Sequence, residues 1–136
     1  MSELTVYPDV SDVILIHTEM IELFGGRDGV RDYFLLDSAL ERPKATFGGE
    51  DLYPRIFGKA AALIQSLILN HPFDDGNKRT AITTCALFLH LNGYKVNLPT
   101  KESMTFTLHI DNHSLTLEQI AVWLEKQTKQ ERKKTA

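Results

Sequence analysis

Apolar residues recur at helical spacing along most of this chain, so that their side chains would share one face of an α-helix. The first such stripe runs from Val13 to Phe24, and we expect Ser11 or Asp12 to cap its start. Gly25 follows directly and is typical of a helix end. A shorter helix is predicted from about Asp32 to Arg42, where a proline ends it.

Two stretches in the middle of the chain are strongly apolar, the first of them almost all round. Helices of this kind lie at the centre of a fold rather than on its surface. The first is predicted from Arg55 to Asn70, with Pro54 in its first turn. The second is predicted from about Asn77 to Leu91, and Asn92 and Gly93 form its end. These two helices are expected to form the centre of the molecule.

The rest of the chain completes the expected bundle. A short extended piece from Tyr94 to Leu98 precedes two further helices, about Thr100 to Ile110 and about Thr116 to Lys126. The tail from Lys129 to Ala136 is polar and charged and is expected to fray. The predicted fold class is therefore all-α, a compact bundle of about six helices around two buried ones.

One segment outside the predicted helices has the features of a functional loop. From Lys44 to Tyr53 the sequence shows no periodicity and contains the adjacent glycines Gly48 and Gly49. Loops carry binding roles more often than packed elements do. We therefore predict a functional loop or short flap between the second and third helices.

Composition limits the class of protein. A chain of 136 residues with 43% hydrophobic residues fits one globular domain spanning residues 1–136. A net charge of −3 gives no reason to expect direct binding of nucleic acid. The single cysteine, Cys85, excludes an internal disulfide and a zinc site of several thiolates. Neither a signal peptide nor an apolar run of about 18 residues is found, so we expect a cytoplasmic protein without membrane contact.

The chemically richest part of the chain separates the two central helices. Residues 71–79, with the sequence HPFDDGNKR, place an imidazole, carboxylates, an amide and cations beside the core. Polar groups in such a place need partners, so the cluster is not filler. Gly76 allows a tight turn or the close approach of a ligand. The N–H groups of Asn77, Lys78 and Arg79 then open a helix, and helix N-termini bind anions.

The side chains of this segment match the needs of phosphate chemistry. Lys78 and Arg79 oppose the helix dipole, which a bound anion would explain, and an arginine can hold a phosphate through two hydrogen bonds. Asp75 is a hard oxygen ligand suited to a magnesium ion. His71 can accept a proton near neutral pH. Together these groups predict phosphoryl or nucleotidyl transfer.

Three other side chains are expected to have structural roles. Phe73 interrupts the polar run and is interpreted as the anchor that fixes the loop to the core. His17 lies beside the apolar stripe of the first helix and is expected to be a satisfied histidine rather than a ligand. Cys85 lies in the second central helix, where inert packing is expected.

The segment 71–79 resembles the Fic motif, in which His, Phe, an acid, a small residue, Asn, Gly or Lys, and Arg occupy set positions. The flanking sequences FGGRDGVRDYFLLDSALERPKATFGGEDLYP and KAAALIQSLILNHPFDDGNKRTA, together with Lys78, resemble the death-on-curing (Doc) toxins of that superfamily. The resemblance covers about Val13 to Leu124. It implies the Fic fold and a toxin controlled by a separate, Phd-like antitoxin protein. Two stretches approach the self-inhibitory motif of Fic enzymes, but each departs from it at the last position.

The resemblance also implies roles for single residues. His71 would be the general base that deprotonates a serine or threonine hydroxyl of a target protein, and Asp75 would bind Mg²⁺. The flap, residues 44–53, would hold the target segment in an extended form. The predicted ATP site consists of Gly76, Asn77, Lys78 and Arg79. The predicted catalytic residues are His71, Lys78 and Arg79.

Lys78 bears on which part of ATP is transferred. Fic enzymes that transfer AMP usually have glycine at this position, whereas the lysine of Doc-like toxins implies a reversed ATP that offers its γ-phosphate. The resemblance thus implies a protein kinase that stops translation by modifying elongation factor Tu. Pro72 and Gly76 are closer to the AMP-transferring branch, so an AMP transferase with the same site remains an alternative. A catalytically silent protein-binding module is the third hypothesis.

Overall fold

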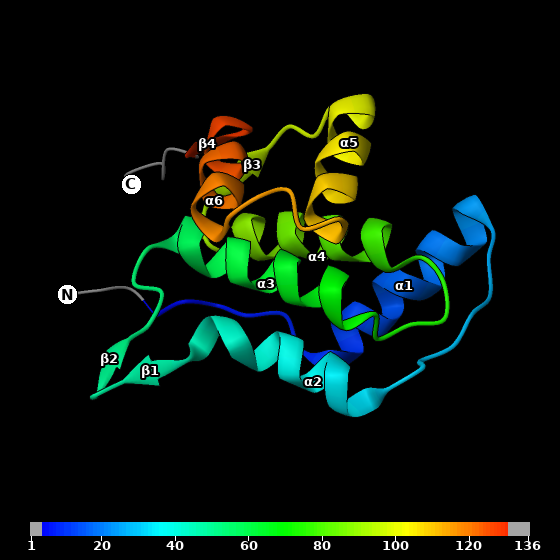
Figure 1. Ribbon diagram of the computed structural model, residues 1–136, viewed down its shortest axis with the longest axis horizontal. Helices are drawn as coiled ribbons and strands as arrows, with labels where there is room; N and C mark the ends of the chain where they lie inside the picture. The colour runs from blue at the N-terminus through cyan, green and yellow to red at the C-terminus, as the bar shows by residue number, and fades with distance from the viewer. Residues whose placement is uncertain (1–3, 131–136) are drawn as a thin grey trace, which may run out of the picture.

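The molecule is built around two long helices that lie side by side. The computed structural model describes residues 4–130, and its central pair consists of α3 (Ile56–Asn70) and α4 (Asn77–Leu91). The helices around them are α1 (Val10–Phe24), α2 (Tyr33–Glu41), α5 (Thr100–Asp111) and α6 (Leu117–Lys126). Figure 1 shows α2 on one side of the central pair and α5 and α6 on the other. The predicted all-α bundle around two buried helices is confirmed.

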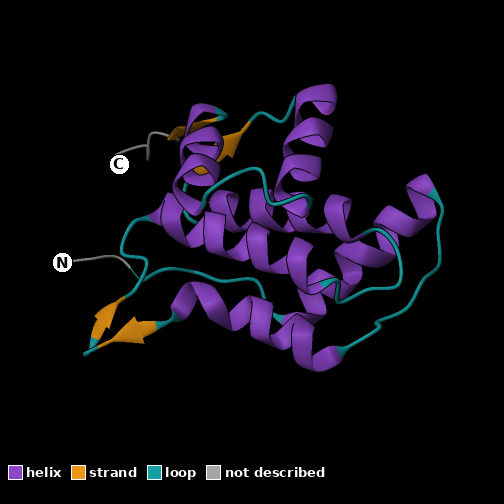
Figure 2. Ribbon diagram, viewed as in Figure 1, coloured by secondary structure: helices purple, strands orange, loops and turns teal. Residues whose placement is uncertain are grey.

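Besides the helices, the described residues contain two short pairs of strands (Figure 2). After the 3₁₀ turn η1 (Arg42–Lys44), strands β1 (Thr46–Phe47) and β2 (Glu50–Asp51) form an antiparallel hairpin. This hairpin lies within the predicted flap. Strands β3 (Tyr94–Val96) and β4 (Thr128–Gln130) form the second antiparallel pair.

The predicted fraying of the tail is wrong at its first residues. Lys129 pairs with Lys95, and β4 continues to Gln130. The extended piece after α4 offers a free strand edge, and its backbone groups hydrogen-bond those of the incoming chain. The remainder of the predicted tail, residues 131–136, lies outside the described residues.

The start of α1 differs from the prediction. The helix begins at Val10 and is capped by Asp9, not by Ser11 or Asp12. The Asp9 carboxylate accepts a hydrogen bond from the Asp12 N–H at 2.9 Å, and the Asp12 carboxylate accepts one from the Asp9 N–H at 2.9 Å. This reciprocal capping box satisfies two N–H groups, which favours the earlier residue as the cap.

The ends of the central helices define the segment that holds the chemistry. Helix α3 is preceded by its N-cap, Arg55, so Pro54 lies before the helix rather than in its first turn as predicted. At its other end, His71 adopts a left-handed conformation with φ 47° and ψ 57°. Gly76, also left-handed, is the N-cap of α4. The segment 71–76 therefore joins the ends of two buried helices.

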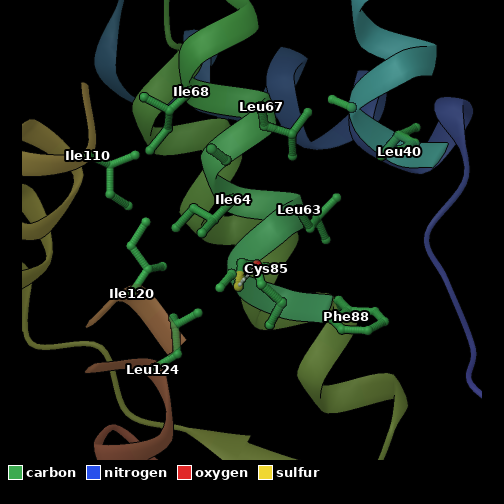
Figure 3. Packing of buried hydrophobic residues seen from close by; sticks show 14 of the residues in the cluster. Leu40, Leu63, Ile64, Leu67, Ile68, Cys85, Phe88, Ile110, Ile120 and Leu124 are labelled. Carbon is green, nitrogen blue, oxygen red and sulfur yellow. Dashed lines mark hydrogen bonds between the residues drawn. The ribbon is translucent and has the colours of Figure 1, made fainter. Parts of the chain in front are cut away.

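The core lies between α3 and all its neighbours, as Figure 3 shows. Apolar side chains of α3 meet α4 on one face, α2 on a second, and α5 and α6 on a third. The buried residues labelled there are Leu40, Leu63, Ile64, Leu67, Ile68, Cys85, Phe88, Ile110, Ile120 and Leu124. Burial raises the pKa of the Cys85 thiol to about 12, so the group stays protonated and packs as an apolar side chain. Within residues 4–130, none of the helices has the length and apolar character needed to cross a bilayer.

Shortening a side chain at the centre of this core should destabilise the fold. Leu67 is 1% exposed, so Leu67→Ala should lower the free energy of unfolding by about 2–5 kcal/mol. The same change at Leu15, which is 70% exposed, removes little buried area and should leave stability within about 0.5 kcal/mol of the parent. Urea denaturation followed by circular dichroism measures both. Equal losses at the two positions would contradict the assignment of α3 to the centre.

Candidate active site

The segment 71–76 is held from outside by the loop between α1 and α2. The N–H groups of Arg31 and Asp32 both donate to the carbonyl of Pro72, at 2.7 and 3.1 Å. Val30 and Phe73 form an isolated antiparallel bridge. These backbone contacts join residues far apart in the sequence and fix the path of the segment beside the core.

Arg31 also secures the end of α3. Its Nε donates to the carbonyl of His71 at 2.7 Å, and its Nη2 donates to the carbonyl of Asn70 at 2.9 Å. Carbonyl groups at a helix C-terminus lack partners within the helix and attract cations. A left-handed conformation at a residue other than glycine costs about 1–2 kcal/mol, and the Arg31 contacts offset this cost at His71.

Phe73 and His17 form the buried support of the segment. Phe73 is buried, and its ring stacks on the imidazole of His17 with the ring centroids 3.8 Å apart. His17 Nε2 lies 2.7 Å from the carbonyl oxygen of Asp75. A carbonyl only accepts, so this Nε2 carries the proton. Both residues have the structural roles that were predicted, and His17 also holds the backbone of Asp75 in place.

Asn77 ties the segment to the first turn of α4. Its Oδ1 accepts from the N–H of Phe73 and its Nδ2 donates to the carbonyl of Phe73, both at 3.0 Å. The amide side chain is therefore used within the protein, and the main-chain N–H is what Asn77 can offer to an anion. Gly76, the N-cap, has φ 77°, and no side chain of the described residues caps this end of α4. An uncapped N-terminus leaves its N–H groups available to a ligand.

Asp75 points its carboxylate toward the loop between α1 and α2. Its Oδ2 accepts a hydrogen bond from the N–H of Arg27 at 2.7 Å, and the side chain is exposed. The neighbouring backbone passes so close that a Cβ at Gly26 would lie 3.2 Å from the Asp75 Cβ, and Gly26 has φ 114°. This is a position that favours glycine.

The donor set fits a magnesium ion that is shared with a phosphate. Among residues 4–130, no group of three or more His, Cys, Asp or Glu side chains could hold a metal by itself. Magnesium is commonly bound through one or two carboxylates, with water and substrate phosphates as the remaining ligands. Asp75 fits this type of site, in which the protein contributes a single carboxylate.

The two cations of α4 have different neighbours. The guanidinium carbon of Arg79 lies 3.8 Å from the centre of the Phe24 ring, a cation–π contact at the end of α1. Lys78 Nζ lies 3.4 Å from Oδ2 of Asp111. Both cations line a mainly apolar groove of about 180 Å³ between α1, α4 and α5. It is lined in part by Met20, Phe24, Ile82 and Met104.

Asp111, in the last turn of α5, joins the site but is absent from the predicted set. Its Oδ1 lies 3.2 Å from His71 Nε2, and its Oδ2 pairs with Lys78. One sign of it was present in the sequence, because an acid in the last turn of a helix opposes the helix dipole. The structure thus brings His71, Lys78 and Asp111 together, while Arg79 lies against Phe24.

Fold and site together define a helical protein whose central helix begins at an uncapped, cation-bearing N-terminus, next to a histidine and an exposed carboxylate. The family model of the Fic/DOC family matches residues 7–89, which include α1 to α3, the segment 71–76 and most of α4. This chain belongs to the Fic/DOC family.

Two curated relatives agree with this membership. The chain is 52% identical over 93 residues to Toxin Doc of Mycolicibacterium smegmatis, covering 68% of this chain and 69% of the relative. It is 31% identical over 85 residues to Protein kinase doc of Escherichia phage P1, covering 62% of this chain and 67% of that protein. The predicted resemblance to the Doc branch is confirmed.

Removing the Asn77 amide should loosen the segment 71–76. Asn77→Ala leaves the N–H and carbonyl of Phe73 without their partner, so we expect a loss of about 1–3 kcal/mol in stability. The amide hydrogen of Phe73 should also exchange faster with solvent. Hydrogen exchange followed by NMR and urea denaturation measure the two effects. Asp74→Ala, an exposed side chain of the same segment, is the matched control. If Phe73 exchange were equal in both variants, the Asn77 contacts would not hold the segment.

Proposed function

We propose that this chain is the toxin of a type II toxin–antitoxin system and acts as a protein kinase that uses ATP and Mg²⁺. Its substrate would be a serine or threonine hydroxyl on a translation factor, for which elongation factor Tu is the candidate. The observation that carries this proposal is that His71 and Lys78 both contact Asp111 beside the uncapped N-terminus of α4. The similarity to Toxin Doc and to Protein kinase doc supports the toxic role and the transferred group.

The phosphates of ATP would bind at the start of α4. The N–H groups of Asn77, Lys78 and Arg79 and the dipole of the helix attract negative charge there. The left-handed Gly76 brings the backbone to this position without a side chain. Lys78 and Arg79 would add charge to the same place. Binding of phosphate would then offset the unfavourable position of two cations in the first turn of a helix.

Proton removal would fall to His71. Its side chain is half-exposed at the end of α3, which leaves it accessible to a hydroxyl of another protein. As the hydroxyl oxygen bonds to the γ-phosphorus, its proton would pass to the imidazole, and the bond from phosphorus to the ADP oxygen would break. Mg²⁺ on Asp75, when bound, would neutralise charge on the phosphate oxygens.

The β1–β2 hairpin is the proposed docking edge for the target. A buried lysine of α3, Lys59, forms an ion pair with Asp51 at 3.1 Å and so fixes the hairpin to the core. On the following segment, the hydroxyl of Tyr53 accepts from Arg42 Nε at 3.2 Å. Phe47 at the hairpin is exposed. A short, anchored hairpin can add an extended target segment by strand pairing.

Control of such a toxin would come from a separate protein. We propose a Phd-like antitoxin as the cognate partner, in line with the similarity to Toxin Doc. An AMP transferase with the same residues and a silent protein-binding module are the two competing functions. They differ from the kinase in the fate of the nucleotide, which an isotope experiment can follow.

Incubation with elongation factor Tu and Mg-ATP tests the three functions. With ATP labelled at the γ-phosphate or at the adenine, we expect only the γ label to reach the protein. Adenine label on the target would instead establish AMP transfer. Nucleotide binding without transfer to any protein of a whole-cell extract would establish the binding module.

A variant of the base gives the matching mutational test. His71→Ala should lower transfer of the γ label by at least about 100-fold, because a positioned base contributes that much. It should also abolish toxicity when expressed, with an unchanged urea midpoint, since the side chain is half-exposed. His90→Ala, at an exposed histidine late in α4, is the control and should behave like the parent. A His71→Ala protein as toxic as the parent would refute the base assignment.

Asp75 should set the requirement for magnesium. Asp75→Asn keeps an oxygen that can accept from the Arg27 N–H, so the segment should hold its shape while the charge is lost. We expect the Mg²⁺ concentration for half-maximal transfer to rise by about tenfold or more. Mutating a residue that only supports a metal ligand already lowers metal affinity by about 10–100-fold, and loss of the ligand's charge should cost at least as much. Asp74→Asn, one position away and exposed, is the control. Equal magnesium titrations of the two variants would remove Asp75 from the metal site.

A further inference from the structure

A single carboxylate bridges the two residues to which the proposed function gives the most specific tasks. Asp111 Oδ1 lies 3.2 Å from His71 Nε2, and Asp111 Oδ2 lies 3.4 Å from Lys78 Nζ. The side chain of Asp111 is 26% exposed, whereas those of His71 and Lys78 are 49% and 44% exposed. Asp111 belongs to α5, beyond residues 7–89 that the family model matches.

We propose that Asp111 is a positioning residue of the site, which sets the tautomer and orientation of His71 and holds Lys78 beside it. This proposal rests on the proposed function for the roles of the two residues that it positions. It extends the site from the segment between α3 and α4 to the end of α5.

The contact with His71 determines which ring nitrogen can act as the base. An ionised carboxylate only accepts hydrogen bonds, so the Nε2 that faces Asp111 must carry a proton. The lone pair for the incoming hydroxyl proton is then on Nδ1. Once Nδ1 has accepted that proton the ring is a cation, and the carboxylate of Asp111 stabilises it. A carboxylate that orients a catalytic imidazole in this way is also found in the Ser-His-Asp triad.

The contact with Lys78 follows the same logic. A flexible lysine side chain can adopt many rotamers, and pairing with a fixed acid limits them. Protein kinases use such a pair, in which a glutamate holds the lysine that contacts the nucleotide phosphates. An ion pair between partly exposed side chains contributes little to folding stability, so the effect of this pair should appear in the reaction.

The position of Asp111 supports a role beyond the helix that carries it. A carboxylate in the last turn of α5 and a lysine in the first turn of α4 are each unfavourable for their own helix dipole. Helices α4 and α5 pack together, and the two opposed charges meet there. If Asp111 served only to neutralise the charge of Lys78, its contact with the imidazole of His71 would not be needed.

Steady-state kinetics of γ-phosphate transfer show whether Asp111 positions the catalytic groups or inhibits them. Asp111→Ala should lower kcat by at least about tenfold, with a smaller change in the KM for ATP. Glu102→Ala, an exposed acid in the first turn of the same helix, is the matched control and should leave both constants unchanged. An unchanged kcat in Asp111→Ala overturns the proposal. A raised kcat also overturns the proposal, because it means that the contacts of Asp111 inhibit the reaction.

A spectroscopic measurement tests the contact without any activity. Long-range ¹⁵N–¹H spectra in mildly alkaline buffer report the tautomer of each neutral imidazole, and the His71→Ala variant assigns the signals of His71. We expect His71 wholly in the Nε2–H form in the parent and in a mixture of both forms in Asp111→Ala. The same mixture in the parent overturns the proposal, even if the protein transfers phosphate. The Nε2–H form in a parent that transfers no phosphate supports the contact and refutes the kinase function instead.

Discussion

The apolar contact between α3 and α4 holds both ends of the segment 71–76, and the rest of the site depends on it. Because α3 ends and α4 begins beside the core, the polar groups between them cannot drift apart as they would in a surface loop. His71 is placed at one helix end and Gly76 at the other. The packing of Leu63, Leu67 and their neighbours therefore fixes the two helix ends that carry the site.

Around this segment, each residue with an unfavourable backbone conformation or charge position has a partner that compensates for it. The left-handed backbone of His71 is accompanied by Arg31, whose guanidinium binds the last carbonyl groups of α3. Lys78 opposes the dipole of α4, and Asp111 opposes the dipole of α5, and each is the partner of the other. Arg79 lies over the ring of Phe24. Strain and exposed charge of this kind persist where the surrounding structure compensates for them, which is typical of functional sites.

Much of the fold followed from short-range patterns. The limits of α4 and the end of α1 agree with the prediction, because apolar periodicity and the glycines after each helix act over one or two turns. Asp9 was missed as the cap of α1, since its partner Asp12 was itself taken as a candidate. Strand β4 was missed because its partner, β3, lies far away in the sequence. Pairing of distant backbone segments leaves no periodic signal in either one.

The sequence by itself determined the chemical content of the site: an imidazole, a carboxylate, cations and a glycine between two helices that had to be buried. The tertiary structure decided which of these groups meet. It assigned the Asn77 amide to Phe73, the Asp75 carbonyl to His17, and His71 and Lys78 to Asp111. Residue types and local spacing are properties of the chain. Contacts between α1, the central helices and α5 arise only when apolar faces pack and bring distant polar groups within hydrogen-bonding distance.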